Sequence, residues 1–155
     1  MGFGSISVKG RALRYLSQRE HSRVELERKL ARHVADTEEF SAQAQIQRAL
    51  DELAAGDLLS ETRVAESVLH NQGQRYGVRR LKQTLQMKGL DPALVTATLQ
   101  AARGTEVERA LEVWRRRFGT PATDAAERAR QMRFMAGRGF EGGVIHQVVQ
   151  GNDDD

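Results

Sequence analysis

The sequence of 155 residues has no cysteine, only two prolines and an aromatic content of 5%. Without cysteine the chain forms neither a disulfide framework nor a thiolate metal site, which is typical of proteins in a reducing compartment. No apolar run is long enough to cross a bilayer and no secretory signal is present, so we expect a cytoplasmic protein that binds no membrane. The low aromatic content favours small helices with leucine and alanine cores.

The residues that usually carry catalysis are scattered. His21, His33, His70 and His146 show no metal-ligand spacing, and no glycine-rich phosphate loop precedes a helix. The glycine-rich stretch 137–143 is interpreted as a repeat turn followed by a short helix. We therefore predict that the chain is not an enzyme, with no catalytic residue, no metal and no cofactor.

The charge is unevenly distributed. The formal net charge of +3 combines 24 Lys and Arg with 21 Asp and Glu, and three of the acidic residues end the chain at 153–155. Without this tail, which we expect to be disordered, the balance is +6, from 24 basic minus 18 acidic residues. Most of the basic residues are Arg, whose planar fork suits phosphate and carboxylate groups. An anionic partner is therefore indicated.

The clearest helical unit runs from Gly56 to Gly104. Apolar residues recur at helical spacing in three segments of this unit. Ser60 is expected to cap the first segment, Gly89 to end the second in a left-handed conformation, and Asp91 to cap the third. No alternation typical of a β-strand is present, so the unit is predicted to contain three helices.

Looser copies of this unit lie on both sides of it. The order Arg-Gly-Phe-Glu at 138–141 repeats Lys-Gly-Leu-Asp at 88–91, and apolar positions follow at the same interval of about fifty residues, within the range of helical repeats. On the N-terminal side, 22–30 mirrors 77–85, with a polar insertion before the next helix. The sequence therefore predicts an all-α protein of three tandem three-helix repeats.

The predicted repeats divide the chain into five parts. The first part is expected to be flexible because it contains two glycines and two serines and no helical stripe. The parts are an N-terminal arm (1–9), three helical repeats (10–55, 56–103 and 104–150) and an acidic tail (151–155).

Basic residues are concentrated around the second helix of the central repeat and at two places in the last repeat. Some of them end a predicted helix, where each cation also stabilises the macrodipole by about 0.3–1 kcal/mol. A solvated helix face is therefore an alternative to a binding surface. The candidates for a surface that faces acidic protein residues or DNA phosphate are Arg75, Arg79, Arg80, Lys82, Lys88, Arg115, Arg116, Arg128, Arg130 and Arg133.

Two aromatic residues each have two interpretations. Tyr76, just ahead of the basic helix, is placed either for base stacking on single-stranded nucleic acid or for packing in a turn. Trp114 lies among Val107, Leu111 and Phe118 at helical spacing, which favours a position in the core over a ligand platform.

Four short motifs occur in order along the chain. They are Gly-Asp-Leu-Leu-Ser-Glu-Thr-Arg at 56–63, the helix start Tyr-Gly at 76–77, the turn Lys-Gly-Leu at 88–90 and Arg-Gly-Phe at 138–140. With these motifs the chain resembles RecX, a family of bacterial regulators of the RecA recombinase. The resemblance covers roughly Ala12 to Val149.

The chain departs from the family's pattern at three positions. Ser60 stands where the family often has Asp, and Val64 and Val68 stand where it often has aromatic residues. Ser60 still suits a helix cap and the valines still suit a core, so the fold that the resemblance implies is unaffected.

The resemblance implies an elongated, curved array of right-angle-packed helices. It also implies a partner that composition and spacing do not identify. RecX proteins bind the filament that RecA forms on single-stranded DNA and inhibit its ATPase, strand exchange and extension, which modulates recombination, DNA repair and the SOS response. We therefore expect a monomeric regulator of the RecA filament, with direct binding of single- or double-stranded DNA as a further property.

Two other functions stay open at the level of sequence. A three-helix unit with a basic helix also suits a DNA-binding protein that acts by competing for single-stranded DNA. A general helical scaffold with another partner is the second alternative.

Overall fold

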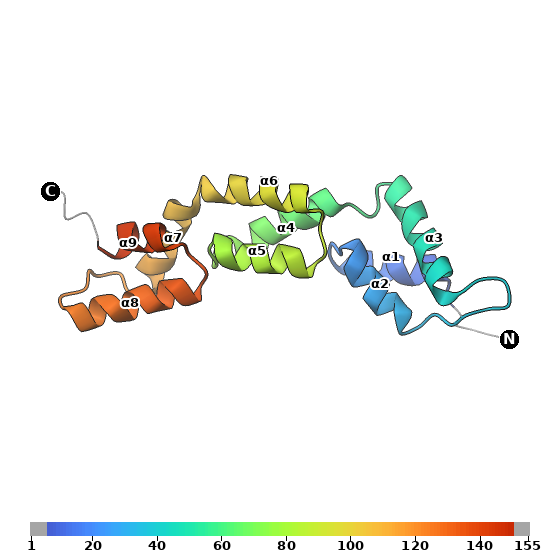
Figure 1. Ribbon diagram of the computed structural model, residues 1–155, viewed down its shortest axis with the longest axis horizontal. Helices are drawn as coiled ribbons and strands as arrows, with labels where there is room; N and C mark the ends of the chain where they lie inside the picture. The colour runs from blue at the N-terminus through green and yellow to red at the C-terminus, as the bar shows by residue number, and fades with distance from the viewer. Residues whose placement is uncertain (1–5, 151–155) are drawn as a thin grey trace. The chain divides into compact units, whose positions relative to one another are not determined.

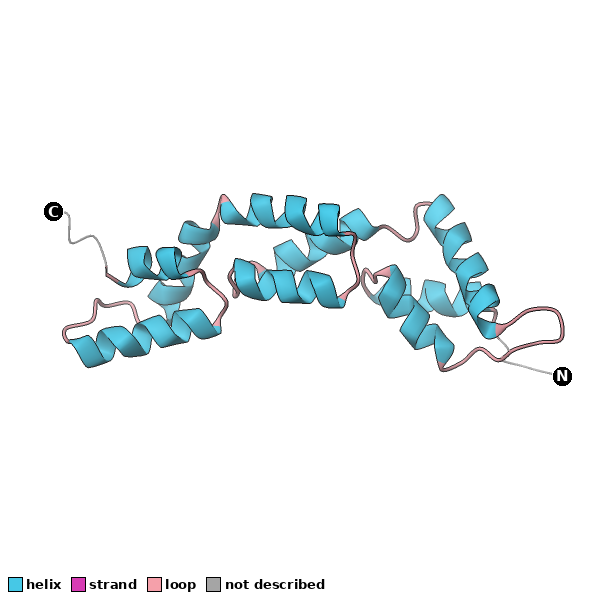
Figure 2. Ribbon diagram, in the orientation of Figure 1, coloured by secondary structure: helices cyan, strands magenta, loops and turns pink. Residues whose placement is uncertain are grey.

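A computed structural model describes residues 6–150 of the chain. In this part nine α-helices are present and no strand (Figures 1 and 2), which confirms the predicted all-α class. Within the same residues, no helix combines the length and apolarity needed to cross a bilayer. The helices are α1 (Val8–Gln18), α2 (Arg23–Ala31), α3 (Ala42–Ala55), α4 (Glu61–Gln72), α5 (Val78–Met87), α6 (Pro92–Arg103), α7 (Glu106–Arg117), α8 (Ala125–Gly137) and α9 (Gly142–Val149).

The first helix begins earlier than the sequence suggested. Helix α1 starts at Val8, inside the segment predicted as an arm, because the side chain of Ser7 accepts a hydrogen bond of 2.9 Å from the backbone N–H of Gly10. Such a cap satisfies a free amide of the first turn. Residues 1–5 of the predicted arm and the predicted tail at 151–155 lie outside the described residues.

Side-chain caps begin most of the helices, including those predicted for Ser60 and Asp91. Ser22 and Glu25 make the reciprocal capping box of α2, in which each side chain accepts from the other residue's backbone N–H. Ser60 accepts from the backbone N–H of Arg63 at 3.2 Å. Single side-chain caps at the starts of α3, α6 and α8 come from Ser41, Asp91 and Asp124. The local sequence therefore sets these helix starts.

The helices form two compact units. The first contains residues up to Val64 together with Lys88–Leu90, and the second contains Ala65–Met87 together with the residues from Asp91 onward. In the first unit α1, α2 and α3 pack on one another. Its buried core consists of Ala12, Leu26, Leu30, Ile46, Leu50, Leu53 and Leu59.

In the second unit α5 packs on α6, and α9 packs on both α7 and α8 (Figure 1). Trp114 is a core residue, as predicted: it is 9% exposed, and its indole N–H donates to Oε1 of the buried Gln131 at 2.9 Å. The core around it includes Ala110, Val113, Met135, Phe140, Ile145, Val148 and Val149. The apolar stripe of α5 is buried beside α6.

The start of α5 is bonded directly to the turn between α8 and α9. The backbone N–H of Gly77 donates to the carbonyl of Arg138 at 2.9 Å, and that of Arg79 donates to Gly139 at 3.0 Å. A Cβ on Gly77 would lie 2.4 Å from backbone atoms of Phe140, so no side chain fits there. The glycine at position 77 permits this close approach.

A buried carboxylate completes this contact. Glu106, which is 2% exposed at the start of α7, accepts hydrogen bonds from the backbone N–H groups of Val78 at 3.2 Å and Glu141 at 3.3 Å. The first unit contains a similar arrangement, in which Glu61 at the start of α4 accepts from the N–H of Arg23 at 3.0 Å. In both cases an acidic residue that begins one helix satisfies the first amide of another.

Candidate functional site

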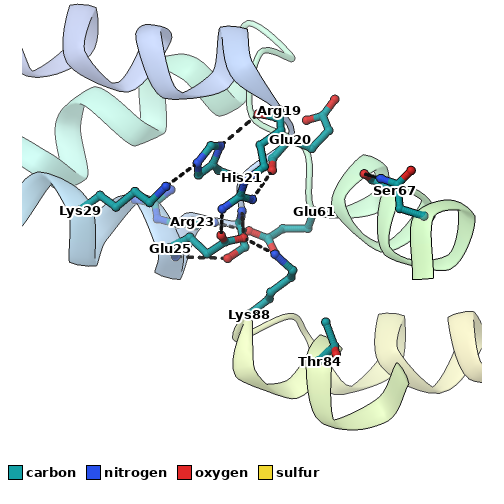
Figure 3. A network of polar contacts seen from close by, with 12 residues as sticks. Arg19, Glu20, His21, Arg23, Glu25, Lys29, Glu61, Ser67, Thr84 and Lys88 are labelled. Carbon is teal, nitrogen blue, oxygen red and sulfur yellow. Dashed lines mark hydrogen bonds and ion pairs between the residues drawn. The ribbon is translucent and has the colours of Figure 1, made fainter. Parts of the chain in front are cut away.

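Lys88 is not available to an external partner. Its Nζ lies 2.8 Å from Oε1 of Glu25, and the two side chains are 18% and 15% exposed (Figure 3). Glu25 also accepts from Arg19 at 2.7 Å and from the backbone N–H of Ser22 at 3.1 Å. Burial acts to raise the pKa of Glu25, but the hydrogen bonds from Arg19 and Lys88 outweigh it and lower the pKa to about 2. Lys88 is therefore not part of the exposed basic surface to which the sequence assigned it, and its role is structural.

His21 belongs to the same polar network. Its ring is fully buried, with Nδ1 3.0 Å from the carbonyl of Arg19 and Nε2 2.9 Å from Nζ of Lys29 (Figure 3). Burial lowers the pKa of His21, the hydrogen bond to the Arg19 carbonyl partly opposes this, and the charges of Arg19 and Lys29 lower the pKa further. A neutral ring that donates from Nδ1 and accepts at Nε2 satisfies both contacts. This histidine holds α1 and α2 together.

Two of the predicted arginines are paired with carboxylates of their own helices. Arg130 makes two hydrogen bonds of 2.9 Å with Glu127, and Arg115 lies 3.2 Å from Glu112. Exposed pairs of this kind contribute little to stability and exchange readily with an external anion. The seven other candidates are exposed and have no carboxylate within 4.0 Å among residues 6–150. They are Arg75, Arg79, Arg80, Lys82, Arg116, Arg128 and Arg133.

Tyr76 is surrounded by guanidinium groups. The guanidinium carbon of Arg80 lies 4.1 Å from the centre of the tyrosine ring, and those of Arg138 and Arg75 lie at 5.6 and 5.7 Å. These are cation–π distances. The ring is half-buried, and its contacts with these arginines favour the packing interpretation of Tyr76 over base stacking.

Two phenylalanines continue this pattern. The ring of Phe134 has Arg138 at 5.1 Å and Arg117 at 5.2 Å, and the ring of Phe118 has Arg130 at 5.3 Å and Arg117 at 5.7 Å. The two phenylalanine rings meet edge to face at 5.4 Å. We call the whole set the arginine–aromatic row, and it consists of Arg75, Arg80, Arg117, Arg130, Arg138, Tyr76, Phe118 and Phe134.

The turn that carries Tyr76 is fixed by a half-buried arginine. The guanidinium of Arg109 donates to the carbonyls of Gly73 and Tyr76, each at 2.8 Å, and to that of Ala102 at 2.9 Å. Burial lowers the pKa of Arg109, and the nearby Glu106 opposes this effect. Because the carbonyls are bonded from inside the unit, the position of Tyr76 relative to α7 is set by the fold.

A cleft of about 250 Å³ lies beside the row. It contains no acidic residue, and its apolar surface comes from Val113 and Phe134. The lining residues are Gln74, Arg75, Val113, Arg116, Arg117, Phe134 and Arg138. An anion that also carries an apolar or planar group matches this lining.

The sequence identified part of this site. It predicted Arg75, Arg80, Arg116 and Arg130, and it missed Arg117 and Arg138. A weak signal was available for Arg117, which directly precedes Phe118 and lies in the run 115–117. Arg138 was interpreted only as part of a turn, because nothing local indicates that its side chain contacts two rings.

The chain is similar to known proteins over almost its whole length. Residues 60–99 match the second three-helix domain of RecX, and residues 105–149 match the third. The chain is 50% identical over 145 residues to "Regulatory protein RecX" of Leptothrix cholodnii, covering 94% of this chain and 88% of that protein. It is also 50% identical over 151 residues to the protein of the same name in Ralstonia nicotianae, covering 96% and 89%. The crystal structure of RecX from Lactobacillus salivarius shares the fold, with a TM-score of 0.72 at 21% identity over 92% of each chain.

Proposed function

Because the chain belongs to the RecX family of regulatory proteins, we propose that it binds the RecA filament on single-stranded DNA and inhibits its ATPase, strand exchange and extension. Through this inhibition it modulates recombination, DNA repair and the SOS response. The observation that carries the proposal is the identity of 50% with a protein named as a RecX regulator, over 94% of this chain. As a regulator of RecA it acts in the cytoplasm, and we propose that it does so as a monomer.

The surface chemistry of the second unit supports an anionic partner. The arginine–aromatic row carries five guanidinium groups, and only Arg130 among them is paired with a carboxylate of the described residues. Arg79 and Lys82 add exposed charge on α5. Acidic residues of RecA or phosphates of its DNA would complement this face, and electrostatic complementarity of this kind accelerates association and selects partners.

Inhibition needs no catalytic group on this chain. A protein that binds one state of a filament more tightly than another shifts the filament toward the state it prefers, by an amount set by the difference in affinity. ATP turnover requires the filament to pass between states, so preferential binding slows it. This mechanism fits relatives that are named regulatory proteins and have an all-helical fold.

The test is the single-stranded-DNA-dependent ATPase of the RecA from the same organism. The protein is titrated into the assay while DNA is kept in excess. We expect inhibition at well below one copy per RecA, at concentrations too low to coat the DNA. Absence of inhibition at concentrations equal to RecA would contradict the proposal.

The second candidate function is competition for the DNA strand. The observation that favours it is the alternation of arginine and aromatic side chains, which resembles surfaces that bind single strands. In the same titration, a competitor inhibits only near DNA saturation, and added DNA restores the ATPase rate. A filament regulator remains inhibitory when DNA is added.

A further inference from the structure

His21 is a buried titratable side chain outside the proposed binding surface. It lies in residues 19–22, the connection between the C-cap of α1 and the N-cap of α2. Its exposed fraction is 0%, whereas an unperturbed histidine gains a proton at about pH 6.5. A proton on this ring would therefore place a charge inside the first unit.

The two polar contacts of the ring fix its protonation state (Figure 3). The backbone carbonyl of Arg19 can only accept, so Nδ1, which lies 3.0 Å away, donates to it. The ammonium of Lys29 can only donate, so Nε2, which lies 2.9 Å away, accepts from it. A ring with one donor and one acceptor is neutral.

A second proton would disrupt the contact with Lys29. Nε2 would then carry a hydrogen and face an ammonium group, so a hydrogen bond would become a repulsion between two cations. Lys29 is half-buried, and its Nζ also lies 4.9 Å from the centre of the Tyr15 ring, a cation–π distance. Moving Lys29 away would lose this contact and would still leave the protonated ring without an acceptor at Nε2.

The carboxylates near the ring are already bound by cations. Glu25 accepts hydrogen bonds of 2.7 Å from Arg19 and 2.8 Å from Lys88. The carboxylate of Glu20, the neighbour of His21 in the sequence, lies 3.0 Å from a guanidinium of α4. The titratable and charged groups that face the ring directly, or through these two carboxylates, are Tyr15, Arg19, Glu20, Glu25, Lys29, Arg63 and Lys88.

Helix α3, which packs on both α1 and α2, offers no free carboxylate either. Its two acidic residues are Asp51 and Glu52. Asp51 lies 2.7 Å from Arg23, and Glu52 lies 3.5 Å from Lys9 and 3.7 Å from Arg48. A protonated ring would therefore have to break an existing ion pair to find an anionic partner in the first unit.

The surroundings of His21 make the folded first unit resist protonation. Burial lowers the pKa of His21 below its usual value of 6.5, and the charges of Arg19 and Lys29 lower the pKa further. The hydrogen bond to the Arg19 carbonyl and the charge of Glu25 oppose this effect only in part. An opened connection would bind the proton more readily than the closed one, so protonation favours opening.

We propose that His21 is a pH-sensitive switch in the first unit: protonation of its ring displaces Lys29 and opens the connection between α1 and α2, while the second unit stays folded. The connection is closed above about pH 6.5 and opens as the pH falls below this value. The pKa of Glu25 is about 2, so this residue stays ionised and does not cause the change. The inference concerns the first unit alone and holds whether or not the chain regulates RecA.

The test follows amide hydrogen exchange of the full chain between pH 7.5 and 5.5 in the absence of RecA. After correction for the intrinsic exchange rate, we expect protection of α1 and α2 to fall below pH 6.5 by up to about tenfold per pH unit, the value for one proton. Protection of α7, α8 and α9, and the fluorescence of Trp114, should stay nearly constant. A loss of protection in α1 and α2 no greater than in α7, α8 and α9 overturns the proposal.

A change at Lys29 tests the mechanism. Lys29→Met removes the ammonium and keeps an apolar stem, so we expect the pKa of His21, measured by NMR of the histidine rings, to rise and the pH dependence of protection to shrink. The control is Lys9→Met, which removes the same charge from a half-exposed position of α1. An unchanged pKa in Lys29→Met, an equal change in Lys9→Met, or a parent ring that titrates at or above pH 6.5 would refute the proposal.

His21→Gln removes the titrating group itself. We expect the pH dependence of protection in α1 and α2 between pH 7.5 and 5.5 to disappear, and the missing NMR signal assigns the ring of His21 in the parent. A folded His21→Gln protein whose α1 and α2 still lose protection below pH 6.5 would contradict the proposal, because the proton would then act on another group. If this variant does not fold, the comparison of Lys29→Met with Lys9→Met decides.

Discussion

Replacing Gly77 with alanine tests the contact that holds the start of α5 against the turn between α8 and α9. The new Cβ would lie 2.4 Å from Cα and N of Phe140 and 2.5 Å from the carbonyl oxygen of Gly139. These are backbone atoms, which do not rotate away as a side chain would. The turn must therefore move away from α5, and the two backbone hydrogen bonds from Gly77 and Arg79 must lengthen or break.

The expected cost follows from these contacts. Each backbone hydrogen bond contributes about 0.5–1.5 kcal/mol net, so losing two costs about 1–3 kcal/mol. Forcing an extra carbon into packed structure costs about 1–3 kcal/mol more. Gly77→Ala should thus reduce the free energy of unfolding by about 2–6 kcal/mol, a large share of the roughly 5–15 kcal/mol of a typical domain.

Urea denaturation followed by the fluorescence of Trp114 is the suitable assay, because this residue is the only tryptophan and is buried in the second unit. The matched control is Gly137→Ala at the last residue of α8, where a Cβ would have no atom within 4 Å. Alanine is the better helix former, so the control should be unchanged or more stable by up to about 1 kcal/mol. A Gly77→Ala protein within about 0.5 kcal/mol of the parent would refute the reasoning, because that is the range of neutral surface substitutions.

Three other perturbations have defined outcomes. Because the pKa of Glu25 is about 2 in the folded state and 4.5 ordinarily, its ionisation stabilises the fold above pH 4.5. This contribution disappears as the pH falls from 4.5 toward 2, so stability measured across this range should fall less in Glu25→Gln than in the parent. Glu106→Ala removes the acceptor of the buried Val78 N–H and of the part-buried Glu141 N–H and should cost up to about 2–6 kcal/mol in urea denaturation, whereas Glu106→Gln retains an acceptor and should cost less. Reversing the charge of Arg79 and Arg80 together should weaken binding to the RecA filament and flatten its salt dependence in a pull-down or ATPase titration; unchanged affinity and salt dependence would remove α5 from the proposed interface.

The features predictable from sequence are those with local signals. Ser60 and Asp91 each accept from an amide within three residues, so local spacing alone indicated these two helix starts. The burial of Trp114 followed from apolar residues at helical spacing. Repetition of a four-residue turn after about fifty residues then indicated the repeat class.

The features that escaped prediction depend on residues far apart in the chain. Lys88 looked like an exposed cation because its partner Glu25 lies 63 positions away. Arg138 reaches Tyr76 only because the α8–α9 turn is bonded to the start of α5, a contact with no local sequence signal. The local charge pattern therefore predicted the region of the candidate site, whereas tertiary contacts determine which side chains belong to it.

The bonding of the first turn of α5 limits how the chain can be divided. The amides of Gly77, Val78 and Arg79 have their partners at Arg138, Glu106 and Gly139, all in the last repeat. A fragment that ended at Gly104 would keep α5 and lack all three acceptors. The repeats are thus separate units in the sequence but depend on one another for folding. The last two should be deleted or transplanted only as a pair.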